Sequence, residues 1–148
     1  MNAHLARFLA VVALATVAFT RTADANAPAG RYTTSGGTVY DTKTKLTWQQ
    51  AVAPGAYTWA NAKAYCAGLS LNGTGWRLPT IKELQTIVDE SQTNPSIDTT
   101  AFPSTPANWF WSSSPLAGSS SDAWRVYFGY GGTGYYDVSY TSLVRCVR

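Results

Sequence analysis

The feature that most constrains this 148-residue sequence is its pair of cysteines, Cys66 and Cys146. Whether two cysteines pair depends on the compartment, because disulfides persist in oxidising surroundings and are rare in the cytosol. Residues 1–25 indicate export: a positive start precedes the apolar run FLAVVALATVAF, and ADA ends in the small-x-small form of a signal-peptidase site. A disulfide is therefore favoured over free or metal-bound thiols. It would close about 80 residues, for which chain entropy gives roughly 4–5 kcal/mol as an upper figure.

Cleavage after Ala25 would leave one domain of ordinary size, residues 26–148. The apolar run is shorter than the roughly 18 residues that a membrane-spanning helix needs, so we expect no membrane span after cleavage. Removal lowers the 11 basic and 8 acidic residues to 9 and 7, which is too small an excess to indicate nucleic-acid binding. It also removes His4, the only histidine, which excludes Ser–His and Cys–His catalysis and histidine-ligated metal sites.

The stretch GTGWRLPTIKEL, residues 73–84, leads from an extended segment into a helix. Thr80 and Glu83 have the spacing of a reciprocal capping box, in which each side chain accepts from the other's backbone N–H. Apolar residues then recur at helical spacing, at Ile81, Leu84, Ile87 and Val88. We interpret the stretch as a structural joint rather than a catalytic loop.

Two more elements are expected before this joint. GTVYDTKTKLTWQQ, residues 37–50, has apolar residues on both sides of a polar turn and predicts a β-hairpin. YTWANAKAYCAGL, residues 57–69, has helical apolar spacing, with Thr58 as the N-cap and Cys66 facing inward. After the joint, residues 91–109 are rich in Ser, Thr, Asn and Pro and predict a long irregular loop.

The last third of the chain predicts an antiparallel sheet, because WFWSSSP, AWRVYFGY and YYDVSYTSLVRCVR are separated by Gly- and Ser-rich turns. Alternation predicts that the core face carries Trp124, Val126, Phe128, Val144 and Cys146. Trp111 is also expected in the core. It assigns to the outward face Arg125, Tyr127 and Arg145. With two helices, these elements predict an α+β domain whose N- and C-terminal strands lie close together.

The ordered motifs GTVYDTKTKLTWQQ, GWRLPTIKEL, FWSSSP, AWRVYF and LVRCVR closely resemble the bacterial DUF1566, or Lcl C-terminal, domain family, over about residues 30–148. That family is similar in fold to C-type lectins and to formylglycine-generating enzymes. The resemblance therefore implies a C-type-lectin-like domain, and a bridge from the first helix to the last strand matches Cys66 and Cys146.

Fold alone does not assign function, because this scaffold hosts enzymes, lectins and protein receptors. The Glu-Pro-Asn, Gln-Pro-Asp and Trp-Asn-Asp motifs of calcium-dependent lectins do not occur here, and no dense acidic run suits Ca²⁺. The only cysteine pair suits a structural bridge rather than a formylglycine-generating active site. We therefore expect a non-catalytic module with no metal and no cofactor.

The C-terminal aromatic residues, interleaved with Ser and Gly, have a composition typical of a binding surface. The collagen-like adhesin that names the family is associated with sulfated glycans, so the resemblance implies an anionic polysaccharide at the cell surface, in the periplasm or outside. The alternative is a protein ligand on a surface diversified by a retroelement. The expected binding residues are Trp109, Arg125, Tyr127, Tyr130, Tyr135, Tyr136, Tyr140 and Arg145.

Overall fold

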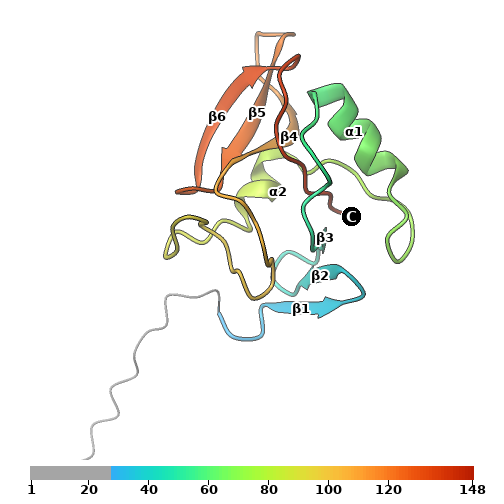
Figure 1. Cartoon of the computed structure of the whole chain (residues 1–148), viewed down its shortest axis with the longest axis vertical. Coiled ribbons are helices and arrows are strands. Elements are labelled where there is room, and N and C mark those ends of the chain that lie inside the picture. Colours follow the sequence, from blue (N-terminus) through green and yellow to red (C-terminus); the bar gives the residue numbers. More distant parts are fainter. Residues whose placement is uncertain (1–27) are drawn as a thin grey trace, which may run out of the picture.

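A computed structural model describes residues 28–148, so the predicted export signal lies outside the described residues. Residues 28–148 form an α+β domain with two three-stranded antiparallel sheets and two helices (Figure 1). The elements are β1 (Tyr32–Ser35), β2 (Thr38–Asp41), β3 (Thr47–Gln49), α1 (Trp59–Gly68), α2 (Ile81–Gln85), β4 (Trp109–Pro115), β5 (Asp122–Tyr127) and β6 (Gly132–Asp137).

The first sheet contains the predicted hairpin, β2 and β3, and a strand that the sequence pattern did not predict, β1. Its third strand also meets the end of the chain. The backbone of Thr47 exchanges two hydrogen bonds of 2.9 Å with Arg148, and Gln49 N–H donates to the Cys146 carbonyl at 2.9 Å. The N-terminal sheet and the last residues of the chain therefore lie together, in agreement with the prediction that the terminal strands are close.

Helix α1 confirms the predicted helix, and it buries Ala62 and Cys66. Thr58 occupies the N-cap position with extended backbone angles, but its side chain makes no capping hydrogen bond. The helix is instead fixed by its neighbours, since the indole N–H of Trp59 donates to the Ser112 carbonyl at 2.7 Å.

Helix α2 begins with the predicted capping box. Glu83 N–H donates to the Thr80 hydroxyl at 3.2 Å, and Thr80 N–H donates to the Glu83 carboxylate at 2.8 Å. The helix is shorter than predicted and ends at Gln85. The Thr86 hydroxyl donates to the Glu83 carbonyl at 2.6 Å, a local bond that competes with continued helix. Ile87 is nevertheless buried, because the chain turns there without leaving the core.

The second sheet has the order β4-β5-β6 and follows the long irregular segment predicted after α2. The last residues do not form the strand that we predicted. They run as an extended segment with isolated bridges, from Ser142 to Tyr57, from Leu143 to Phe110 and from Val147 to Trp48 and Arg77. This segment lies between the two sheets and contacts several elements in turn, so no single neighbour pairs with it over a strand's length.

The core has two clusters. One contains Leu84, Phe102, Phe110 and Val126, and the other contains Trp76, Trp111, Ala123 and the two cysteines. Because Val126 and Ala123 point to opposite faces of β5, both faces of the second sheet are partly covered. Trp111 is buried as predicted, but the assignment of Trp124 to the core was wrong, because it is only half-buried.

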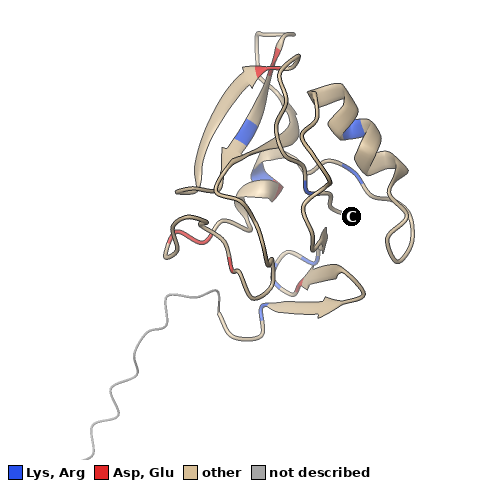
Figure 2. Ribbon diagram, viewed as in Figure 1, with Lys and Arg blue, Asp and Glu red and all other residues tan. Residues whose placement is uncertain are grey.

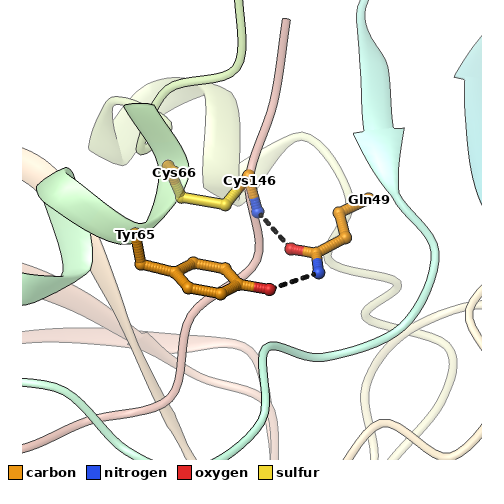
Figure 3. The surroundings of a disulfide bond; sticks show 4 residues. All are labelled: Gln49, Tyr65, Cys66 and Cys146. Carbon is orange, nitrogen blue, oxygen red and sulfur yellow. Dashed lines mark hydrogen bonds between the residues drawn. A yellow bond between two sulfur atoms is a disulfide. The ribbon is translucent and has the colours of Figure 1, made fainter. Parts of the chain in front are cut away.

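The predicted disulfide is present, and it joins Cys66 of α1 to Cys146 of the terminal segment. Figure 3 shows that Gln49 lies beside it. The Gln49 amide donates to the Tyr65 hydroxyl at 3.0 Å and accepts from Cys146 N–H at 3.3 Å. The bridge and this side chain together connect the hairpin, α1 and the chain end.

Candidate functional site

The candidate site lies on one face of the second sheet, and its position follows from the strand register. Arg125 on β5 lies opposite Trp111 on β4 and Gly134 on β6. Residues directly opposite each other in a sheet project to the same face. Applied along the sheet, the register places on this face Trp109, Trp111, Ala123, Arg125, Tyr127, Gly132, Gly134 and Tyr136.

The guanidinium of Arg125 lies against two aromatic rings. Its central carbon is 4.3 Å from the Trp109 ring centre and 4.2 Å from the Tyr136 ring centre. Such contacts hold a cation by the ring quadrupole. Nε is buried and has no hydrogen-bond partner within the described part of the chain, where Nη1 makes a 3.5 Å contact with the Ser142 hydroxyl. Burial lowers the pKa of Arg125, although the nearby Tyr136 partly opposes that shift.

More aromatic rings extend this face on both sides of Arg125. Trp109 contacts Tyr127 at 5.1 Å between ring centres, and Tyr127 contacts Tyr130 at 5.0 Å. Tyr136 contacts Tyr140 at 4.8 Å on the other side. Tyr130 and Tyr140 are 65% and 57% exposed. We call this set the Arg125 surface; its members are Trp109, Arg125, Tyr127, Tyr130, Tyr136 and Tyr140.

Glycines let these rings lie against the backbone. A Cβ atom at Gly134 would be 3.0 Å from the Trp109 ring, and one at Gly132 would be 2.3 Å from the Tyr130 ring. Both glycines belong to β6 and to the Gly-rich stretch GYGGTGYY, residues 129–136, and they accommodate the rings.

Two predicted site residues, Tyr135 and Arg145, lie outside the Arg125 surface. Tyr135 is 54% exposed but projects to the opposite face of the sheet, where its ring meets Trp124 at 5.6 Å. Tyr135 is therefore not part of the Arg125 surface.

A residue that the sequence argument missed is Ser142, which contacts Arg125. Only the return of the terminal segment past β4 brings Ser142 there, and no sequence spacing signals that path.

The prediction that Arg145 faces outward was wrong. Arg145 is fully buried, with its guanidinium carbon 4.7 Å from the Phe102 ring centre. Among residues 28–148, Nη2 donates to the Thr105 hydroxyl at 2.8 Å, while Nε and Nη1 have no partner. Burial lowers the pKa of Arg145 to about 9. Val144 and Cys146 do point into a core, but the other side of this segment is covered by the loop that carries Phe102 and Thr105.

Charge pairing separates Arg125 from two other arginines. Arg31 donates to both carboxylate oxygens of Asp41, and Arg77 donates to both oxygens of Glu83 at 2.7 Å. Within residues 28–148, Arg125 has no carboxylate at ion-pair distance. Charged residues are also sparse on the second sheet (Figure 2). Arg125 therefore retains its capacity to pair with an anion.

A hollow of about 370 Å³ lies beside the first sheet and is lined by Arg31, Tyr32, Asp89, Glu90 and Asp98, among others. It contains none of the predicted site residues, and its cation is already paired with Asp41. Among residues 28–148, no group of three or more His, Cys, Asp or Glu side chains is arranged to hold a metal ion. In the same part of the chain, no helix is long and apolar enough to cross a membrane.

Comparison with known proteins gives one family. No curated protein sequence matches the chain significantly. The family model of the Lcl C-terminal domain matches residues 37–148, a range that includes the hairpin, both helices, the second sheet and both cysteines. The chain therefore belongs to the Lcl C-terminal domain family.

Proposed function

We propose that this protein is an exported, non-catalytic binding module whose Arg125 surface recognises an anionic polysaccharide, such as a sulfated one, without calcium. The observation that carries the proposal is a guanidinium that lies against two aromatic rings and has no carboxylate of residues 28–148 at ion-pair distance. The proposed partner is a polysaccharide outside the cell or on its surface.

The arginine supplies the charge selectivity of the proposed site. A guanidinium presents its N–H donors in a planar fork, which matches the oxygens of sulfate and carboxylate. The contacts with Trp109 and Tyr136 restrict the side chain before any ligand arrives. Less side-chain entropy is then lost on binding, which favours affinity.

The rings supply the contact area. Tyr130, Tyr136 and Tyr140 are exposed, and they offer flat apolar faces with polar hydroxyl ends. A sugar ring has an apolar C–H face that can cover an aromatic ring, while its hydroxyl groups remain hydrogen-bonded around the edge. Rigid aromatic side chains lose little conformational entropy when they make such contacts.

Export is supported by the Cys66–Cys146 disulfide, which is compatible with an oxidising compartment. It is also supported by the form of residues 1–25. Calcium independence is supported by the chemistry of the Arg125 surface, because none of its side chains is a carboxylate, the usual protein ligand of Ca²⁺.

The test is binding of the purified protein to immobilised heparin, used as a model sulfated polymer, at several salt concentrations and with or without a calcium chelator. Arg125→Glu combined with Tyr127→Ala should weaken binding at least tenfold. Wild-type affinity should fall as salt rises, because the charged contacts are screened. The chelator should have no effect.

Two variants control for general effects of charge and aromatic area. Lys82→Glu makes the same charge change at an exposed position of α2, and Tyr40→Ala removes an exposed ring from the first sheet. Both should bind heparin almost as wild type does. Binding that ignores salt and the Arg125 double substitution would contradict the proposal and favour a protein ligand.

A further inference from the structure

Strand β6 forms a free edge of the second sheet. Within residues 28–148 it pairs with β5 on one side only, and no other segment of that part of the chain runs along its outer side (Figure 1). An unpaired edge exposes a row of backbone donors and acceptors that can template another strand.

The hydrogen-bond alternation of antiparallel strands determines which groups of β6 face away from β5. Val138 N–H donates to the Ser121 carbonyl at 2.9 Å, so Ser121 and every second residue after it on β5 face β6. By the register, the β6 residues that face β5 are Gly132, Gly134 and Tyr136. The intervening residues, Thr133 and Tyr135, therefore direct both N–H and C=O to the free side. Asp137 also faces outward, but its carbonyl already accepts from Tyr140 N–H at 3.1 Å.

This edge lacks the usual protection against pairing. Natural edge strands are blunted by lysines, prolines, bulges or a covering element. Between Gly132 and Tyr136 the strand has no charged residue and no proline, and its pairing with β5 is regular. Tyr135 and Tyr136 are 54% and 41% exposed, on opposite faces of the strand. A strand added here would cover apolar area on both faces.

The outward groups are complementary to a second copy of themselves. If two β6 strands run antiparallel about a two-fold axis at Gly134, Thr133 of each copy lies opposite Tyr135 of the other. Each such pair exchanges two hydrogen bonds, so every outward group of these residues is satisfied. Shifting the register by one residue would set outward groups against groups already bonded to β5.

The side chains suit the same register. Gly134 meets its own copy in the closely spaced pair, where Cα atoms approach to about 4.5 Å and glycine is easily accommodated. Tyr135 covers Thr133, an aromatic with β-branched pair of the kind that stabilises sheets. Tyr136 lies opposite Gly132, which carries no side chain, so the Tyr136 ring keeps its contacts with Arg125 and Tyr140.

Charge does not oppose this arrangement. Asp137 is the one charged residue of β6, and about the Gly134 axis the two copies of it are six residues apart along the strands. At about 3.4 Å per residue they are separated by roughly 20 Å, beyond the Debye length of about 8 Å at physiological salt.

We infer that the protein forms a two-fold dimer by antiparallel pairing of β6 with β6 about Gly134, which joins the two second sheets into one. The two Arg125 surfaces then lie on the same face of that sheet, on either side of the axis. A repeating polymer can engage both surfaces at once, which raises avidity without any new contact.

Sedimentation velocity of the purified protein from micromolar to millimolar concentration tests the dimer. A single strand pair is a small interface, so we expect a weak, concentration-dependent dimer. Tyr135→Pro should remain monomeric throughout, because it removes an outward N–H and no bond to β5. Tyr135→Phe keeps the N–H and the ring, so it should dimerise like wild type. A monomeric wild type, or a dimer that persists in Tyr135→Pro, would overturn the inference.

Should Tyr135→Pro fail to fold, cysteine pairing tests the register directly. Residues in a hydrogen-bonded antiparallel pair have Cα atoms about 5.5 Å apart, which suits a disulfide. A mixture of Thr133→Cys and Tyr135→Cys proteins should therefore form the mixed disulfide faster than either protein links to itself. Faster self-linkage of Tyr135→Cys would show a different register and contradict pairing about Gly134. Neither result bears on heparin binding by a monomer.

Discussion

Arg125 and Arg145 have similar local surroundings but differ in their exposure to solvent. Each lies in an extended segment, contacts two or more aromatic rings and has no carboxylate partner among residues 28–148. Arg125 is partly exposed beside exposed tyrosines, whereas Arg145 is completely buried beneath the loop that carries Thr105. Aromatic contacts alone therefore do not identify a binding arginine, and access to solvent separates the two roles.

The comparison assigns Arg145 to the architecture and Arg125 to the ligand. A buried guanidinium with one hydrogen bond destabilises the folded state, because that bond compensates only part of the free energy needed to desolvate the charge. A partly exposed one keeps water as an alternative partner and can exchange it for an anion. The predictions below test this division, in decreasing order of their expected effect on stability.

The largest effect is expected from the bridge next to Arg145. Replacing both Cys66 and Cys146 by alanine removes the constraint on a loop of about 80 residues, and should lower the free energy of unfolding by up to about 4.5 kcal/mol. Urea denaturation followed by tryptophan fluorescence would measure it. A change below about 1 kcal/mol would show that the interior region does not depend on the bridge.

The stability that the Arg145 side chain contributes should depend on its volume more than on its charge. Arg145→Ala should cost about 2–4 kcal/mol, the range for truncating a long buried side chain. Arg145→Met fills similar space without a buried charge, so its stability should be within about 1 kcal/mol of wild type or higher. Thermal denaturation of the two variants compares them. A methionine variant as unstable as the alanine variant would show that the charge is needed.

The joint at α2 lies outside both arginine regions and should affect stability alone. Thr80→Ala removes one half of the capping box and should cost about 0.5–2 kcal/mol. Heparin binding by the folded protein should be unchanged. Weakened binding at an unchanged melting temperature would show that the stretch is a site rather than a joint.

The Arg77–Glu83 pair at the same joint predicts that the stability of the fold depends on pH. The two hydrogen bonds from Arg77 are the main reason that the pKa of Glu83 is lowered to about 2, from an ordinary value of 4.5. A depressed carboxylate pKa stabilises the folded state above the unfolded pKa and loses that effect as the pH falls through the folded pKa. Between pH 4.5 and 2, the melting temperature of Glu83→Gln should therefore fall less than that of wild type. Equal slopes would contradict the pairing.

Local patterns predicted local structure well. The Thr80–Glu83 capping box, the hairpin at 37–50 and α1 follow from spacing alone, because neighbours in sequence decide them. Alternation also predicted correctly that Arg145 and Val144 point to opposite sides. It failed to say that both sides were covered, because the covering loop comes from residues about 40 positions earlier.

The Arg125 surface shows the same limit. Composition indicated exposed tyrosines near the C-terminus, and four of them are exposed. Which tyrosines share a face with Arg125 depends on the pairing of β5 with β6, and this register separates Tyr136 from Tyr135. Contact with Ser142 depends on the path of the terminal segment, which has no local signal.

The most direct test of the division between the two arginines is a calorimetric titration of wild type, Arg125→Met and Arg145→Met with a size-defined heparin fragment in one buffer. The account predicts that Arg125→Met loses at least tenfold in affinity, about 1.4 kcal/mol, while its melting temperature hardly changes. Arg145→Met should bind as wild type does. Equal affinities for wild type and Arg125→Met, or a comparable loss in Arg145→Met, would contradict it.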